Sequence, residues 1–99
     1  TSLRAPGAGI NSGTYAFTQR VVSTNLLGDA TVIYNPITDN DPNAILIITH
    51  NWTADPNSVN KYNLIPVGVY YTAPHWAIFN EDATAMALGR AFNVLVIKP

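Results

Sequence analysis

The sequence predicts an all-β protein, either an antiparallel β-sandwich of the jelly-roll kind or a small barrel, with about six to eight short strands. Short runs rich in β-branched and aromatic residues recur between turn signals along the chain. None of the long apolar runs has helical periodicity. Hydrophobic residues make up 47% of the 99 residues, which suffices for one core but leaves too little chain for a second.

We expect two parts, an extended N-terminal arm over residues 1–13 and a single β-domain over residues 14–99. The arm is rich in Gly, Pro and Ala, a composition that normally frays in a monomer. The runs predicted to form strands in the domain are residues 14–23, 30–35, 44–52, 67–72, 75–80 and 91–98.

Turn signals separate these runs. Gly28-Asp29 and Pro36 end the first segments, and a turn cluster covers residues 40–43. A polar loop follows over residues 53–63. Ala73-Pro74 lies between two strand runs and predicts a hairpin. Residues 81–90 connect to the last strand, with a helical turn expected in residues 83–88.

The low charge excludes several classes of protein. Charged residues are 11% of the chain, where soluble domains usually carry about 25%. The five basic residues are scattered, which argues against nucleic-acid binding. No apolar stretch approaches the roughly 18 residues of a membrane span. The absence of cysteine excludes disulfides, thiolate metal sites and a cysteine nucleophile.

Two predicted strands are apolar on both faces, which a two-layer sandwich does not require. Residues 45–48 and 94–97 are all large aliphatics, so each segment places two of them on the outer face. Each buried aliphatic side chain contributes about 1.5–3 kcal/mol, so a covering by loops of the same chain or by another copy is expected. The residues assigned to self-association in these strands are Leu46, Ile48, Leu95 and Ile97.

No cofactor is expected, and calcium is the one weak metal candidate. Asp39, Asp41 and Asn43 offer oxygen atoms at alternate positions, as calcium loops do. The glycine and the final carboxylate of such a loop are missing, because Ala44 and His50 stand in their places. A turn capped by its own Asx side chains explains the same residues.

The sequence predicts no catalytic residues. His50 and His75 are the only histidines, and they do not belong to a zinc-binding pattern. No serine stands in a nucleophile-elbow motif. Glu81 and Asp82 are adjacent, so on a strand they would face opposite ways. The protein is therefore expected not to be an enzyme.

Aromatic and amide residues suggest a second function. Flat aromatic rings interleaved with asparagine are typical of sugar-binding faces and also of subunit interfaces. The residues expected to stack on a glycan are Trp52, Tyr62, Tyr70 and Tyr71, whereas Trp76 is expected in the core. Asn51-Trp52-Thr53 also matches the N-glycosylation pattern.

Four segments resemble an uncharacterised family of extracellular bacterial domains that often occur as repeats or appended modules. They read NAILIITHNW over residues 43–52, PVGVYY over 66–71, WAIFNED over 76–82 and AFNVLV over 91–96. The resemblance implies export and a non-catalytic role, and it transfers no ligand or functional residue. This chain departs from the family in having one copy, which favours self-assembly over a repeat array.

The function expected first is that of a secreted, non-enzymatic building block of a filament, tube or surface lattice. Its partners would be copies of itself, with Leu3 and Ile10 of the arm lying on a neighbour's sheet. The alternative is a carbohydrate-binding module of a secreted protein. No nucleic acid and no membrane span enter either hypothesis.

Overall fold

A computed structural model of the chain describes residues 12–52 and 63–99. These residues contain strands and turns and no helix, which confirms the all-β fold class. The strands are β1 (Gly13–Arg20), β2 (Leu26–Leu27), β3 (Ala30–Ile33), β4 (Ile45–His50), β5 (Val67–Thr72), β6 (His75–Asn80) and β7 (Ala91–Lys98).

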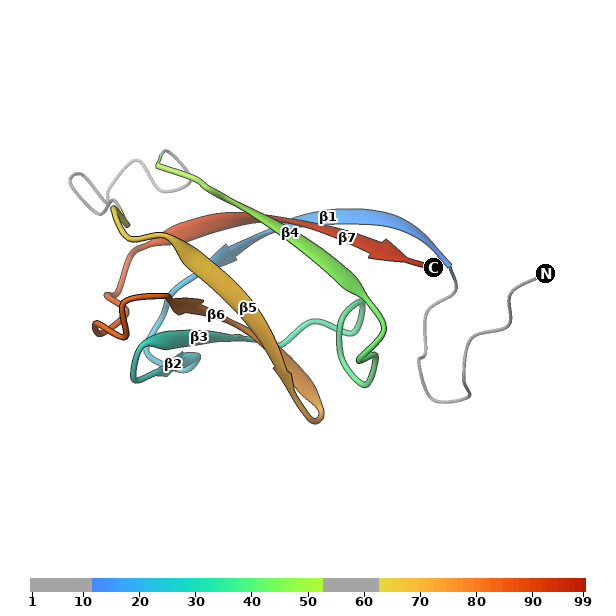
Figure 1. Cartoon of the computed structure of the whole chain (residues 1–99), viewed down its shortest axis with the longest axis horizontal. Helices are drawn as coiled ribbons and strands as arrows, with labels where there is room; N and C mark the ends of the chain where they lie inside the picture. Colours follow the sequence, from blue (N-terminus) through green and yellow to red (C-terminus); the bar gives the residue numbers. More distant parts are fainter. Residues whose placement is uncertain (1–11, 53–62) are drawn as a thin grey trace.

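The strands form two antiparallel sheets that face each other in two layers (Figure 1). One sheet has three strands in the order β1-β7-β4, and the other has four in the order β2-β3-β6-β5. The last strand therefore lies in the centre of the first sheet, between the first strand and the fourth. This is the sandwich that the sequence predicts.

Most predicted strands match the structure. The bounds of β5, β6 and β7 are those expected, and β5 and β6 form the hairpin across the Ala73-Pro74 turn, whose peptide bond is cis. β1 ends three residues early, because the Val22 and Asn25 backbone groups form a tight turn there. β2 was not predicted, since two residues carry too little pattern to identify a strand.

The helical turn expected in residues 83–88 does not form, and this prediction is wrong. Ala83 has a φ of 65°, which no right-handed helix contains. The Asp82 carboxylate accepts hydrogen bonds from the backbone N–H and the hydroxyl of Thr84. Asp82 thereby forms an Asx turn, a local alternative to a helix that side chains of this type commonly supply.

The core lies between the two sheets and is aliphatic and aromatic. Phe92, Val94 and Val96 of β7 are buried in its centre, where they meet Ile33 and Ile78 of the other sheet. The side chains packed around them are Val21, Ala44, Met86, Tyr15, Phe17, Leu26, Ile37, Leu46, Ile48, Val67, Val69 and Trp76. Both layers contribute, so neither sheet is stable in the conformation seen without the other.

Polar side chains join the two layers as well. Gln19 of β1 is buried and donates from Nε2 to the Thr31 hydroxyl and to the Val32 carbonyl of β3, at 3.0 and 2.9 Å. The Thr31 hydroxyl in turn donates to Asn25. These bonds satisfy groups that would otherwise be buried without partners, and they fix the relative position of the sheets.

Candidate functional site

The surface of the three-stranded sheet that faces away from the core is the candidate site. The pairing register arranges its side chains in three rows across β1, β7 and β4. We call the following nine residues the outer face: Thr14, Ile97 and Ile45 in the first row, Ala16, Leu95 and Ile47 in the second, and Thr18, Asn93 and Thr49 in the third.

The outer face is apolar over its first two rows and has no charged residue. Ile45, Ile47 and Leu95 keep 50%, 47% and 37% of their surface exposed. Adjacent apolar side chains with this exposure form a contiguous patch, a feature that marks interaction sites on soluble proteins. The surplus of apolar surface that the sequence predicts is therefore present in the folded chain.

The relief of the outer face is uneven because β1 contributes only small side chains. Ala16 lies beside the larger Leu95, with Ile47 beyond it on β4, and a shallow hollow of about 420 Å³ opens over this part of the sheet. Thr49 and Asn93 form its polar side. The hollow has room for aliphatic side chains of a partner. The exposed side chains of Ile45, Ile47 and Leu95 form a ridge beside it and are of this kind.

In β4 the residues that face outward are not the ones expected from the sequence. The sequence pattern predicts that Leu46 and Ile48 mediate self-association, but both point inward and pack against the core cluster. The outward residues are Ile45 and Ile47 instead. Side chains alternate with period two, so a shift of one residue moves the whole set to the other face. The uniform ILII segment contains no polar residue that would set this phase.

The other self-association residues divide by location. Leu95 and Ile97 of β7 belong to the outer face as expected, with Ile97 half-buried. Leu3 and Ile10 of the arm lie outside the described residues.

Amide side chains extend the third row of the outer face. Asn51 donates from Nδ2 to Oδ1 of Asn93 at 2.8 Å, and Asn93 donates from Nδ2 to the Thr49 hydroxyl at 3.2 Å. Trp52 follows directly and is 53% exposed. An exposed indole beside planar amides is one of the features of a glycan subsite.

The other aromatic residues proposed for glycan stacking do not form a common platform. Tyr70 and Tyr71 are neighbours in β5 and so point to opposite faces of the sheet. Tyr70 packs edge-on against Phe79, and Tyr71 packs edge-on against Trp76, which borders the core as expected. Tyr62 lies outside the described residues.

The outward surface of the four-stranded sheet is partly covered by its own aromatic rings, as Tyr70 and Phe79 pack edge-on. Phe79 lies so close to Gly68 that a Cβ atom there would be 2.9 Å from the ring. Ala30, Val32 and Ala77, which share this side of the sheet, are buried. Tyr70 and Leu27 on this side remain 37% and 60% exposed, so this side is only partly covered.

The carboxylates of the weak calcium candidate have partners within the chain. Asp39 lies 2.8 Å from Nδ1 of His75, and Asp41 lies 3.2 Å from Nζ of Lys98. The backbone N–H of Asn43 donates to Oδ1 of Asp41, as in an Asx turn. Across residues 12–52 and 63–99, no group of His, Asp and Glu side chains has the arrangement of a metal site.

The two histidines lie in different sheets. His50 is exposed at the end of β4, with its ring 5.6 Å from that of Phe92. His75 begins β6 and packs edge-on against Tyr34 while it contacts Asp39. An Asp-His pair can orient an imidazole for acid–base chemistry, but it needs a third reacting group within hydrogen-bonding reach.

Lys98 has a role that the sequence reasoning missed. Its ammonium group is fully buried and donates to the Ile37 carbonyl at 2.7 Å, in addition to its ion pair with Asp41. The indole N–H of Trp76 donates to the Asp41 carbonyl at 2.9 Å. The signal was available in the alternation of β7, where Lys98 occupies an inward position after Phe92, Val94 and Val96.

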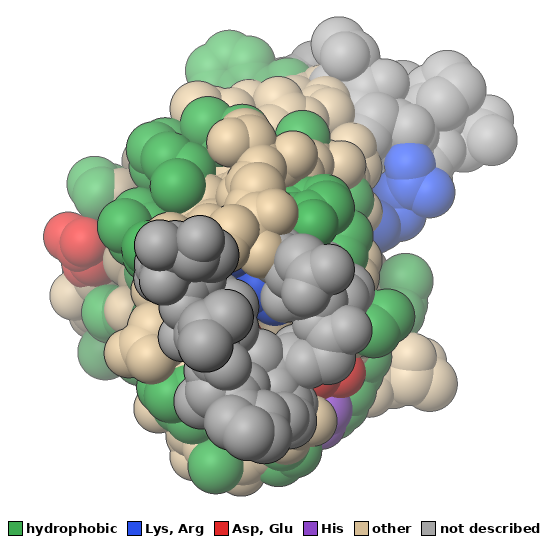
Figure 2. Space-filling model, turned by 90° about the vertical axis from the view of Figure 1, so that its right-hand side faces the viewer, with side chains coloured by type: hydrophobic (Ala, Val, Ile, Leu, Met, Phe, Trp, Pro, Cys, Tyr) green, Lys and Arg blue, Asp and Glu red, His purple; other side chains and the backbone are tan. Residues whose placement is uncertain are grey.

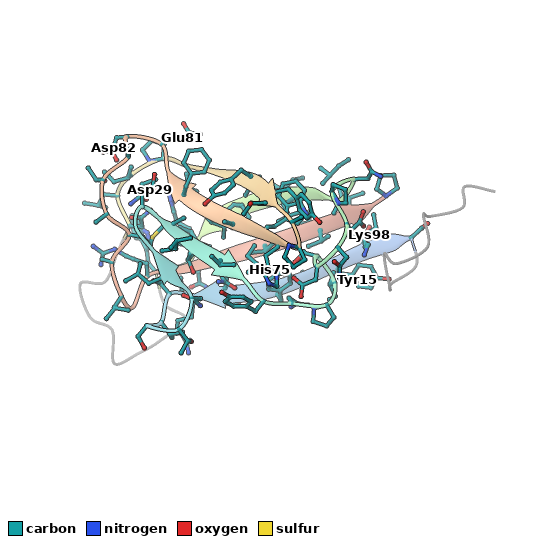
Figure 3. The ribbon with its side chains drawn as sticks, turned by 90° about the horizontal axis from the view of Figure 1, so that it is seen from below. Tyr15, Asp29, His75, Glu81, Asp82 and Lys98 are labelled. Atoms are coloured by element: carbon teal, nitrogen blue, oxygen red, sulfur yellow. The ribbon has the colours of Figure 1, made fainter. Side chains whose placement is uncertain are left out.

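Three acidic residues lie at one end of the molecule, and none of the nine outer-face residues is charged. Figure 3 shows Asp29, Glu81 and Asp82 close together at one end, whereas Lys98 and His75 lie toward the other. On the surface that Figure 2 displays, acidic and basic side chains are few and lie apart among hydrophobic and uncharged ones.

The chain belongs to a family described as a domain of unknown function (DUF7452), whose model matches residues 9–96. No curated protein and no solved structure is significantly similar to it. This agrees with the expected membership of an uncharacterised family. The described residues contain no helix with the length and hydropathy needed to cross a membrane.

Proposed function

We propose that this protein is a non-enzymatic structural subunit that assembles with copies of itself outside the cell. The observation that carries the proposal is the outer face, with three exposed aliphatic side chains and no charge. Export rests on the resemblance to extracellular bacterial domains alone.

Contact between copies would remove this apolar surface from water. Burial of a large aliphatic side chain contributes about 1.5–3 kcal/mol, and such side chains are half exposed at Ile45 and Ile47. A net charge of −1 places little electrostatic repulsion between copies. The small residues of β1 lie beside the large ones of β7 and β4, so one copy can place its ridge in the hollow of another.

The experiment is to measure the mass of the full chain by light scattering and sedimentation over a wide concentration range, with electron microscopy of the assembled fraction. We expect particles larger than one chain, in equilibrium with monomer. A chain that stays monomeric at millimolar concentration would rule the proposal out.

A matched pair of variants tests the role of the outer face. Leu95→Thr shortens an exposed aliphatic on the outer face and should weaken association. Leu88→Thr makes the same change at an exposed leucine that lies outside the outer face and should leave the mass distribution unchanged. Deletion of residues 1–12 measures the contribution expected of Leu3 and Ile10 in the arm.

The second candidate function is carbohydrate binding, favoured by Trp52 with the amide groups of Asn51 and Asn93. A glycan array and tryptophan fluorescence titrations with polysaccharides test it. Binding that is lost in Trp52→Ala but kept in Tyr71→Phe would support it. No response to any polysaccharide would remove it.

A further inference from the structure

The fourth strand forms one edge of the three-stranded sheet, and the described part of the chain provides no ladder partner on its outer side. The Asn51 N–H donates to the Ala91 carbonyl at 3.0 Å, which continues the β4–β7 ladder by one pair. Hydrogen-bonded pairs alternate in an antiparallel ladder. The odd-numbered residues of β4 therefore bond to β7, whereas Leu46, Ile48 and His50 direct their N–H and C=O groups away from it.

Among residues 12–52 and 63–99, β7 is the single ladder partner of β4. Natural proteins protect such an edge with a charged residue, a proline, a glycine or a very short strand. The ILIITH segment of β4 has none of these devices. It is six residues of high β-propensity without net charge, a composition that favours pairing with another strand.

The other edges of the sandwich are protected. β2 has two residues, and β1 ends with the charged Arg20. β5 follows Pro66 and contains Gly68, both of which weaken strand pairing. The unprotected edge and the apolar outer face therefore coincide on one strand.

We infer that β4 pairs edge to edge and antiparallel with β4 of a second copy, about a two-fold axis. This inference rests on the proposed function and adds an edge contact to the face contact argued there, with the edge contact expected to contribute more to the association. The two three-stranded sheets would then form one continuous sheet, and the apolar rows of the outer face would run on across the axis.

A second copy is the occupant that the side chains favour. In this pairing Ile47 lies opposite Ile47 of the second copy, and Leu46 lies opposite its Ile48. The N–H and C=O groups that Leu46 and Ile48 direct to the edge can then form hydrogen bonds between the two strands. At these positions each aliphatic side chain also faces another aliphatic side chain. The strand contains no acidic residue and no lysine, so two copies can pair without placing like charges opposite each other. It also offers no charge that would favour an oppositely charged partner over a second copy. The half-buried Leu46 and Ile48 would also lose their remaining exposure.

Residue-resolved amide hydrogen exchange of the full chain, at a monomeric and at an assembled concentration, tests the pairing. In the monomer the amides of Ile47 and Thr49 are protected by β7, while those of Leu46 and Ile48 exchange fast. Assembly should slow the amide exchange of Leu46 and Ile48 by at least about tenfold. The exchange rates of Ala16 and Thr18, on the edge of β1, should not change.

Other patterns would overturn the inference. Protection of Leu46 and Ile48 already in the monomer would mean that the chain covers its own edge. Assembly without new protection in β4 would mean that copies meet by their faces, which leaves the proposed function standing. A chain that never assembles defeats the proposed function itself.

A pair of substitutions in one cross-strand row provides the second measurement. Ile47→Lys places two lysines opposite each other in the pairing and should raise the dissociation constant about tenfold or more. Leu95→Lys introduces the same charge one strand inward, on the central β7, and should have a clearly smaller effect. Circular dichroism of both variants confirms the fold, and equal weakening by both would favour face-to-face contact over edge pairing.

Discussion

Replacement of the buried lysine should strongly destabilise the sandwich. Lys98→Met keeps most of the side-chain volume but leaves the Asp41 carboxylate, 2% exposed, without its cation. It also removes the donor to the Ile37 carbonyl. Removal of one partner of a buried ion pair costs about 3–5 kcal/mol, because an uncompensated charge remains in the interior.

Chemical and thermal unfolding monitored by tryptophan fluorescence measure this loss of stability. A destabilisation of 3–5 kcal/mol should lower the melting temperature of a domain of this size by more than about 12 °C. Arg20→Met, which removes an exposed positive charge from β1, is the control and should change stability by no more than about 1 kcal/mol, as an exposed ion pair does.

A double-mutant cycle identifies the cause. Asp41→Asn in the Lys98→Met background removes the stranded charge and keeps an oxygen to accept the Asn43 N–H, so it should restore much of the lost stability. If Lys98→Met lost less than about 1 kcal/mol, or if the two substitutions were additive, the buried pair would not be the stabilising contact described.

Two further predictions concern local packing and pH. Gly68→Ala should destabilise the protein by about 1–3 kcal/mol in denaturation experiments, because the new Cβ would lie 2.9 Å from the Phe79 ring; a neutral effect would mean that the ring moves freely. Hydrogen bonds from the Thr84 hydroxyl and backbone N–H lower the pKa of Asp82, so its contribution to stability is present above the unfolded-state pKa and is lost as the pH falls through the folded-state pKa. Carboxyl titration by NMR should show that Thr84→Ala raises the pKa of Asp82, and an unchanged pKa would contradict this cause.

Local patterns were sufficient to locate most strands. The β-branched and aromatic runs of β5, β6 and β7 were predicted with the bounds observed, because turn residues border each of them. Short elements were not predictable in this way. Leu26 and Leu27 form a strand because β3 lies beside them, and a two-residue pattern carries no such information.

The sequence predicted the chemical character of the candidate site, which is apolar, but not all of the residues that form it. Composition and the two-faced aliphatic runs indicated an excess of apolar side chains but left open whether loops of the same chain or another copy would cover them; in the structure Ile45, Ile47 and Leu95 are exposed. The sequence could not show which pair of residues in the ILII segment points outward. Tyr70 and Tyr71 form no common stacking platform, because adjacent residues of one strand face opposite ways, and this alternation is already evident from the sequence.

By itself, then, the sequence determined the fold class, the positions of the longer strands and the excess of apolar side chains, since these depend on period and composition. The tertiary structure decided which side of each strand meets the opposite sheet and which charges meet across the interior, as Lys98 and Asp41 do. The physical reason is that alternation defines two equivalent faces, and only the packing of one sheet against the other makes them different.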